Sequence, residues 1–157
     1  FTGRNRGLGK HTMVGTGGDD YNGCIFFSPE ATGGHIEDGY INKGAISFNS
    51  IMSGKFTVKN TVFDGLAGDS RRAFSTPNWA ELGVEASTME IALEGNEFKN
   101  VPVYDPEGDA QAAIEVNYGT VTWTETKFPT DGIYWRAMDF AKLKINGKDI
   151  ETEKPAE

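Results

Sequence analysis

Several common sequence features are missing, and each absence argues against a particular structural feature or modification. Cys24 is the single cysteine, so no disulfide forms within the chain, and in its apolar run it behaves as a small hydrophobic side chain. There is no run of 18 apolar residues for a membrane-spanning helix and no Asn-x-Ser/Thr glycosylation sequon. The sequence begins with Phe and has no signal-peptide-like apolar stretch, so we expect a processed, trimmed or incomplete chain.

Positive charge is scarce in the second half of the chain. Residues 1–79 carry eight Lys or Arg and seven Asp or Glu, whereas residues 80–157 carry seven and sixteen. The net charge of −8 argues against a nucleic-acid partner, because phosphate binding requires clustered positive charge. The first eleven residues contain Arg4, Arg6 and Lys10 and no acid. A basic N-terminal arm and an acidic C-terminal half are complementary in charge.

What the sequence does contain is a repeat. Gly23, Gly44 and Gly65 lie 21 residues apart. In each unit a short apolar-x-apolar strand is followed about ten residues later by a second strand, a polar turn and an aromatic residue. A period of about 20–50 residues is typical of solenoids and repeat arrays. Because alternate residues of a strand share a face, Ile46 and Phe48 are expected to point into a common core.

The repeat continues with two interruptions. Residues 66–79 break the period, and we expect a loop inserted at a corner there. Residues 82–84 (Leu-Gly-Val) then correspond to 46–48 (Ile-Ser-Phe), and a second insertion over 102–110 precedes a fourth unit over 114–128. Because a single unit cannot bury its own apolar face, neighbouring units must stack. Two sets of side chains are expected to stack from unit to unit: Phe48, Val84 and Val116, and Phe63, Phe98 and Phe128.

The whole pattern resembles one known family. The strand–turn–strand–Asn-x-Phe unit is similar to the coil of the right-handed parallel β-helix in the pectate-lyase-like superfamily, over roughly residues 23–129. The resemblance implies an all-β chain that forms a short solenoid of about four to five coils with two corner-loop insertions. The alternative is an antiparallel β-sandwich, which also has short alternating strands separated by turns.

Four segments are expected along the chain. Residues 1–22 form a Gly-rich basic arm, and residues 23–129 form the coils. Residues 130–150 form a last coil or a hairpin cap, since Asn146-Gly147 is a hairpin-turn signal. Residues 151–157 are charged and form a frayed tail.

The resemblance also implies where catalysis would occur. Pectate-lyase-like enzymes carry Ca²⁺-binding acids and an Arg or Lys base on one strand face, walled by corner loops. The base takes the proton next to a uronate carboxylate, and a cation stabilises the enolate. Asp69, Arg71 and Arg72 in the first insertion are candidates for such chemistry. No family motif carries over residue by residue, and adjacent arginines in a polar loop are usually solvated, so we predict no catalytic residue.

Candidate metal ligands occur in the second insertion. Asp105, Glu107 and Asp109 alternate on a tight Gly turn, and hard cations such as Ca²⁺ take several oxygen ligands. The alternative is an ordinary polar turn, since the late bidentate Glu of an EF-hand loop is missing. We therefore expect no cofactor, with Ca²⁺ as the alternative. His11 and His35 have no cysteine partner nearby, so a zinc site is not expected.

Aromatic residues lie in or beside the corner loops. Exposed rings stack on sugar faces, so a glycan platform is one interpretation. The alternative is that these rings pack the loops onto the coils. The glycan-binding candidates are Trp79, Tyr104, Tyr118 and Trp135, with Phe74 close by.

The function expected from these features is structural. We expect a non-enzymatic, extracellular, cell-surface or virion-surface module that assembles head to tail into a filament, sheath or fibre, with glycan adhesion through its corner loops. Arg4, Arg6 and Lys10 would meet the acidic half of the next copy. The alternative, implied by the fold resemblance, is a polysaccharide lyase or other carbohydrate-active enzyme, or a fragment of one, acting on acidic polysaccharide. The expected partners are further copies and glycans, not nucleic acid or a membrane interior.

Overall fold

The fold consists almost entirely of β-strands. The computed structural model describes residues 11–14, 25–66, 72–108 and 111–153. Within those ranges the strands form two sheets, and one short 3-10 helix, η1 (Val84–Ala86), lies between β8 and β9 in sequence. The smaller sheet has the strand order β1 (His11–Val14), β4 (Gly39–Asn42), β7 (Val62–Asp64) and β10 (Glu97–Lys99).

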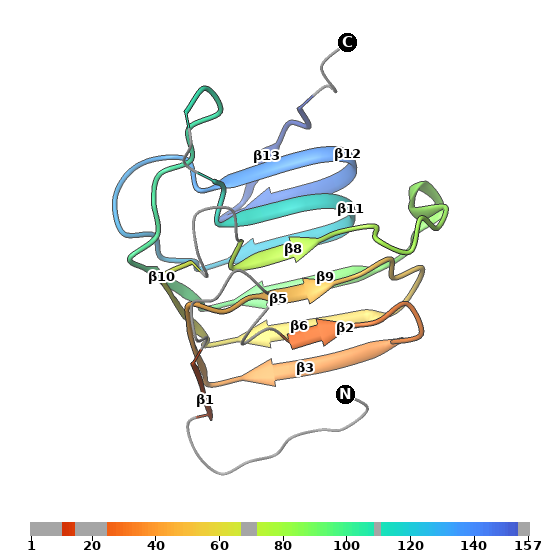
Figure 1. Ribbon diagram of the computed structural model, residues 1–157, viewed down its shortest axis with the longest axis horizontal. Coiled ribbons are helices and arrows are strands. Elements are labelled where there is room, and N and C mark those ends of the chain that lie inside the picture. Colours follow the sequence, from red (N-terminus) through yellow and green to blue (C-terminus); the bar gives the residue numbers. More distant parts are fainter. Residues whose placement is uncertain (1–10, 15–24, 67–71, 109–110, 154–157) are drawn as a thin grey trace.

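The larger sheet is curled, with a long strand at its centre. Its order is β2 (Ile25–Phe27), β5 (Ile46–Phe48), β8 (Phe74–Thr76), β11 (Ile114–Thr124), β9 (Glu90–Glu94), β6 (Lys55–Lys59) and β3 (Gly33–Glu37). Strand β12 (Trp135–Ile145) pairs with β11, and β13 (Lys148–Ile150) pairs with β12. The N-terminal half of β11 pairs with β8 and its C-terminal half with β9, so β11 joins two stacks of shorter strands. Figure 1 shows these strands lying one above another from β3 to β12.

Parallel pairing runs through both sheets. Strands β2, β3 and β4 of one repeat pair in parallel with β5, β6 and β7 of the next. Among the described strand pairs, β12 with β13 is the antiparallel one. The prediction of an all-β chain is confirmed. The antiparallel sandwich is wrong, because a sandwich pairs its strands antiparallel, and the observed arrangement is compatible with a β-helix-like architecture.

Alternation along each strand decides which side chains are buried. In β6 the side chains of Phe56 and Val58 are almost fully buried, whereas Thr57 between them points outward. The same alternation in β9 buries Ile91 and Leu93. Ile46 and Phe48, which the sequence predicted to point into a common core, are likewise fully buried, so that prediction is confirmed.

Tight corners connect the strands of the larger sheet to those of the smaller one. Asn60 and Gly95 follow β6 and β9 and have left-handed φ angles of 49° and 66°. The amide of Asn60 donates to the Glu94 carbonyl at 3.0 Å, and the amide of Gly95 donates to the Thr124 carbonyl at 3.0 Å. The hydrogen-bond ladder between repeats therefore continues around the corner, and one left-handed residue redirects the chain.

Aromatic rings stack in register inside the fold. Phe63 and Phe98 lie 4.8 Å apart, and Phe98 and Phe128 lie 5.3 Å apart, with nearly parallel rings. Tyr134 extends the stack beyond Phe128 at 5.1 Å. The predicted stacking of Phe63, Phe98 and Phe128 is confirmed, and Tyr134 continues it toward β12.

The predicted correspondence of residues 82–84 with residues 46–48 is wrong. Residues 74–76 form strand β8 and pair with β5, with Phe74 opposite Ile46. Val84 belongs to η1, so residues 82–84 are part of the loop that precedes β9. The predicted stack of Phe48, Val84 and Val116 is therefore corrected: Thr76 lies opposite Val116. The physical reason is that Phe74 fills the core, packing against Phe48 and Trp123.

The C-terminal segment closes one end of the larger sheet. Residues 130–150, predicted as a last coil or a hairpin cap, contain the long strand β12, which is followed by a tight turn into β13. Asn146 has a left-handed φ of 49°, and its side chain donates to and accepts from the backbone of Thr126 at 2.9 and 2.8 Å. This amide clamp fixes the turn against the preceding repeat.

Candidate functional site

A single row of side chains crosses the outer face of the larger sheet. The strand registers align Phe26, Ser47, Ser75, Glu115 and Arg136 on β2, β5, β8, β11 and β12. We call this set the outer row. At about 4.8 Å between strands, the outer row spans roughly 19 Å. It is aromatic at the β2 end, has two serine hydroxyls 3.1 Å apart at its centre, and is charged at the β12 end.

The charged end is an alternating set of arginines and glutamates. Glu115 Oε2 accepts from Nη2 of Arg72 at 2.5 Å and lies 3.7 Å from Nη1 of Arg136. Arg136 Nε in turn donates to Oε2 of Glu153 at 2.8 Å. The Glu115 side chain is only 13% exposed, and the two guanidinium groups offset the cost of burying its carboxylate. With Tyr104, these four residues form what we call the charged cluster.

Tyr104 and the last described residues close the charged cluster. The Tyr104 hydroxyl donates to Oε1 of Glu153 at 3.2 Å, and the amide of Glu153 donates to the Ala137 carbonyl at 2.8 Å. Burial raises the pKa of Tyr104, and the nearby Glu153 carboxylate adds to that rise. Burial alone would lower the pKa of Arg136. The neighbouring carboxylates of Glu153 and Glu115 have the larger combined effect, so the pKa of Arg136 is raised. The charged cluster therefore joins two guanidinium groups and two carboxyl groups through direct contacts.

The sequence-predicted catalytic residues are placed only in part. Asp69 and Arg71 lie outside the described residues, and Arg72 is bound to Glu115. Nothing in the repeat pattern distinguishes Glu115 or Arg136 from other charged residues. The signal that would have found them is the strand register, because β8, β11 and β12 bring together residues far apart in the chain. Chemically, the charged cluster fixes two guanidinium groups in place, and an anionic ligand would have to displace a carboxylate.

The aromatic end of the outer row is more open. Trp79 is 52% exposed and Phe26 is 41% exposed. Their ring centroids lie 5.9 Å apart with an interplanar angle of 51°. We call this pair the aromatic platform. It presents large apolar side chains to solvent beside a polar sheet face.

The backbone that carries Trp79 is anchored by the preceding repeat. The Trp79 amide donates to Oδ1 of Asn49 at 2.9 Å, and the Ala80 amide donates to Oγ of Ser50 at 3.0 Å. Oγ of Ser50 also donates to Oδ1 of Asn78 at 2.8 Å. The turn after β5 thus holds the turn after β8, and Trp79 has a fixed main-chain position.

The other predicted glycan-binding rings differ in exposure. Tyr118 is a correction: it is fully buried, its hydroxyl donates to the Phe48 carbonyl, and it accepts from the Ile51 amide, each at 2.7 Å. Burial raises the pKa of Tyr118 to about 12. Phe74 is also fully buried. Because no face of either ring reaches solvent, neither stacks on a sugar.

Tyr104 and Trp135 are intermediate cases. Both side chains are half-buried. Tyr104 donates to Glu153, and the Trp135 ring lies 5.3 Å from Phe128. Glycan binding by these two residues stays a prediction, whereas Trp79 has the exposure that stacking requires.

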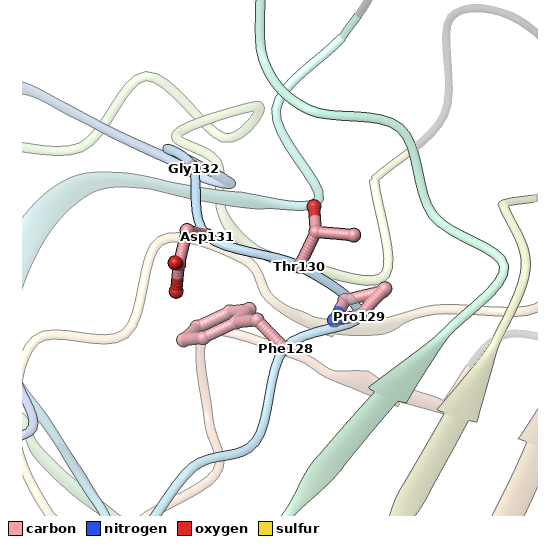
Figure 2. A pocket seen from close by; sticks show the side chains of 5 residues that line it. All are labelled: Phe128, Pro129, Thr130, Asp131 and Gly132. Carbon is pink, nitrogen blue, oxygen red and sulfur yellow. The ribbon is translucent and has the colours of Figure 1, made fainter.

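An open depression lies near the β12 end of the fold. Figure 2 shows its lining residues, with the Phe128 ring and the Asp131 side chain close together: Phe128, Pro129, Thr130, Asp131 and Gly132. The Phe128 ring is covered by Phe98 on one side and Tyr134 on the other. Thr130 is bound through its hydroxyl to that of Tyr134 at 2.6 Å. The depression therefore offers no aromatic face for a sugar.

The predicted metal ligands do not form a cluster in the described chain. Asp105 Oδ1 accepts the Glu107 amide at 3.0 Å, so this carboxylate stabilises its own exposed turn. Asp109 lies outside the described residues. Across the described ranges, no group of three His, Cys, Asp or Glu side chains is arranged to hold a metal ion. His35 is bound to Thr57 and Glu37 instead.

The remaining predictions concern assembly and membranes. Arg4, Arg6 and Lys10 lie outside the described residues, so the structure does not place them. Among the residues that the structure describes, no helix has the length and apolar character needed to cross a membrane.

Comparison with known proteins identified no relative of this chain. No protein-family model matches the chain, and no curated protein or solved structure matches it. Its function is therefore inferred from its own residues.

Proposed function

We propose that the chain is a right-handed parallel β-helix of about four to five coils that acts as a non-enzymatic structural module and associates with further copies of itself. Right-handedness is supported by the strong preference of parallel crossover connections for that hand. An extracellular, cell-surface or virion-surface location is part of the proposal. The proposal that the chain associates with further copies of itself is based on the difference between the two ends of the larger sheet.

One end of the larger sheet is open in the described structure. Strand β3 pairs only with β6, and β2 pairs only with β5, among the described strands. Within the described residues no strand pairs with the outer edge of either one, and an unpaired strand edge is a template for another strand. Gly33 and Gly34 begin β3 and add no side chain that would block a partner.

The other end is covered. Strand β13 pairs with Leu143–Ile145 of β12, and Glu153 pairs with β12 near Met138. A head-to-tail contact would join the β3 edge of one copy to an edge that is already partly occupied. Contact between two open ends avoids this conflict and closes as a two-fold dimer, since an isologous interface uses the same surface twice. We therefore favour the dimer, and a filament requires that β13 be displaced.

Sedimentation velocity over a range of protein and salt concentrations tests the proposal. The wild-type chain is expected to shift from monomer to dimer as its concentration rises. His35→Lys places a lysine on each of the two meeting edge strands and is expected to weaken association at least tenfold, through like-charge repulsion. The matched control is Thr120→Lys, which adds the same charge on the exposed face of β11, a strand paired on both sides.

Two results would contradict the proposal. A wild-type chain that stays monomeric at every protein and salt concentration removes self-association altogether. Equal weakening by His35→Lys and Thr120→Lys would show that general charge, not the β3 edge, controls the contact.

The second candidate is a polysaccharide lyase or other carbohydrate-active enzyme acting on acidic polysaccharide. The observation that favours it is the gathering of Arg72, Tyr104 and Arg136 on one sheet face. Against it, both guanidinium groups are engaged by carboxylates. Incubation with pectin, alginate and glycosaminoglycans, followed by the ultraviolet absorbance of unsaturated products, tests this function. Activity that is lost in Arg72→Ala would reverse the ranking.

A further inference from the structure

We propose that the aromatic platform, Phe26 and Trp79, binds uncharged pyranose chains whose sugars present a continuous C–H face, as β-linked glucose polymers do. The negative face of an aromatic ring attracts such C–H groups, and two rings inclined to each other contact successive sugars or two sides of one. This inference goes beyond self-association and does not depend on it. It is based on the exposed area of the two rings, the anchored backbone of Trp79 and the charges of the neighbouring loop.

The area of the platform suits a sugar better than a protein. Trp79 and Phe26 are 52% and 41% exposed, which corresponds to roughly 200 Å² together if a whole aromatic side chain offers about 150–250 Å². A stable protein interface buries about 800 Å² on each partner. A sugar ring, in contrast, needs only one or two aromatic faces. A second copy of this chain is therefore not the occupant that we assign.

The site is fixed before any ligand arrives. Asn49 Oδ1 accepts from the Trp79 amide and from the Ser50 hydroxyl, each at 2.9 Å. None of the hydrogen bonds that the structure shows within the described residues uses Nδ2 of Asn49, and this side chain is bound to the backbone of the turn that carries Trp79, where its amide can donate to a sugar hydroxyl. Leu82 on the same turn is 39% exposed and is tied through its backbone to Asn78. A pre-organised aromatic face with a nearby donor lowers the entropic cost of binding.

The charge around the platform selects against acidic glycans. Glu81 and Glu85 follow Trp79 on the same loop and are exposed. The sequence has no Lys or Arg between Arg72 and Lys99. A uronate or sulfated chain lying on Trp79 would meet these carboxylates and be repelled, whereas an uncharged chain would not. The ligand class therefore differs from that of the lyase candidate.

Calorimetric titration with cellohexaose, with polygalacturonate as the acidic comparison, tests the proposal. We expect the wild-type chain to bind cellohexaose and not polygalacturonate. Removal of one stacking ring is expected to weaken binding about tenfold or more, by analogy with the loss of a base-stacking ring. Trp79→Ala and Phe26→Ala should both show this loss. Phe140→Ala is the matched control, because Phe140 is 55% exposed but lies on β12.

The same variants are examined by sedimentation to separate sugar binding from self-association. Trp79→Ala that loses cellohexaose binding but sediments like wild type supports the proposal. Three results overturn it: no binding of cellohexaose by the wild type, equal loss in Trp79→Ala and Phe140→Ala, or loss of self-association in Trp79→Ala with no change in sugar binding. The last result would identify the platform as a contact between copies.

Discussion

The inner and outer faces of the same strands differ in what they hold. On the inner side of β5, β8 and β11, Ile46, Phe74 and Ile114 are fully buried and stack across the sheet. One residue further along each strand, the outer row carries a serine, a serine and Glu115. A shift of one residue thus moves from the hydrophobic core to a polar outer face, on which Ser47 is still covered and Ser75 and Glu115 are partly exposed. We expect the inner face to determine stability, and we propose that the outer face and the strand edges make the contacts with other molecules.

The largest effect is expected from the inner aromatic stack. Phe98 is 1% exposed and contacts Phe63, Trp123 and Phe128. Phe98→Ala should lower the free energy of unfolding by about 3–5 kcal/mol, because it leaves a cavity between the rings. Urea unfolding measures the change. Phe140→Ala removes an exposed ring and should cost less than about 0.5 kcal/mol; similar costs for the two variants would contradict the distinction between faces.

Tyr118 gives an intermediate effect that depends on pH. Tyr118→Phe leaves the buried Ile51 amide and Phe48 carbonyl without a partner, which should cost about 1–3 kcal/mol at pH 7. The folded-state pKa of about 12 exceeds the ordinary value of 10.0. Folding therefore favours the protonated hydroxyl, and this contribution is complete below about pH 10 and is lost as the pH rises through about 12.

The size of the alkaline effect follows from the same shift. Two pKa units correspond to about 3 kcal/mol of wild-type stability lost across that window. Urea unfolding at pH 8, 10 and 11.5 should show a steeper decline for the wild type than for Tyr118→Phe. Tyr104→Phe is the control and should retain the steep decline. Identical pH profiles for wild type and Tyr118→Phe would contradict the assignment of the buried hydroxyl.

A smaller effect is expected from the charged cluster. Glu115→Gln leaves Arg72 and Arg136 without their shared carboxylate. Because the cluster is partly exposed, we expect a loss of about 1–2 kcal/mol, below the roughly 3–5 kcal/mol of a fully buried pair. Glu90→Gln breaks an exposed pair with Lys55 and should cost less than about 0.5 kcal/mol. Thermal unfolding at low and high salt compares the two; an equal cost would show that the cluster is an ordinary surface pair.

The smallest stability effect is expected at the aromatic platform. Trp79→Ala removes an exposed ring and keeps the backbone bond to Asn49, so the free energy of unfolding should change by less than about 0.5 kcal/mol. Thermal unfolding checks this value beside the sugar titration. A large destabilisation would show that Trp79 packs the loop onto the sheets. The aromatic platform would then have a structural role instead of a role in sugar binding.

The repeat made much of the fold predictable from sequence. The regular units up to Gly65 and the recurrence of Phe63, Phe98 and Phe128 predicted stacked β-strands with an aromatic core, since each aromatic follows a similar strand and turn. The prediction failed at residues 74–76 because a Phe-Ser-Thr run is too short to distinguish a strand from a loop by alternation. It failed at Tyr118 because β11 continues through an irregularity after Val116 instead of ending at a corner.

The candidate site was less predictable than the fold. Arg72, Glu115 and Arg136 are far apart in the chain. The pairing of β11 with β12 aligns Glu115 with Arg136, and Arg72 reaches Glu115 from the segment just before β8. The sequence predicted Trp79 as an aromatic residue in a corner loop. It did not predict the contact of Trp79 with Phe26, because that contact depends on how Asn49 anchors the turn after β8. Periodicity locates strands along the chain, whereas contacts on the outer face depend on loop lengths that periodicity does not specify.

The central claim is that the chain associates through the outer edge of β3. Hydrogen exchange of β3 tests this claim most directly. Amide exchange of residues 33–37 is measured at low and high protein concentration, with β6 as the internal reference. We predict that part of β3 exchanges rapidly in the dilute protein and becomes protected in the concentrated protein, while β6 stays protected in both. Exchange of β3 that does not depend on concentration, or new protection at β12 instead, would contradict association through the open edge.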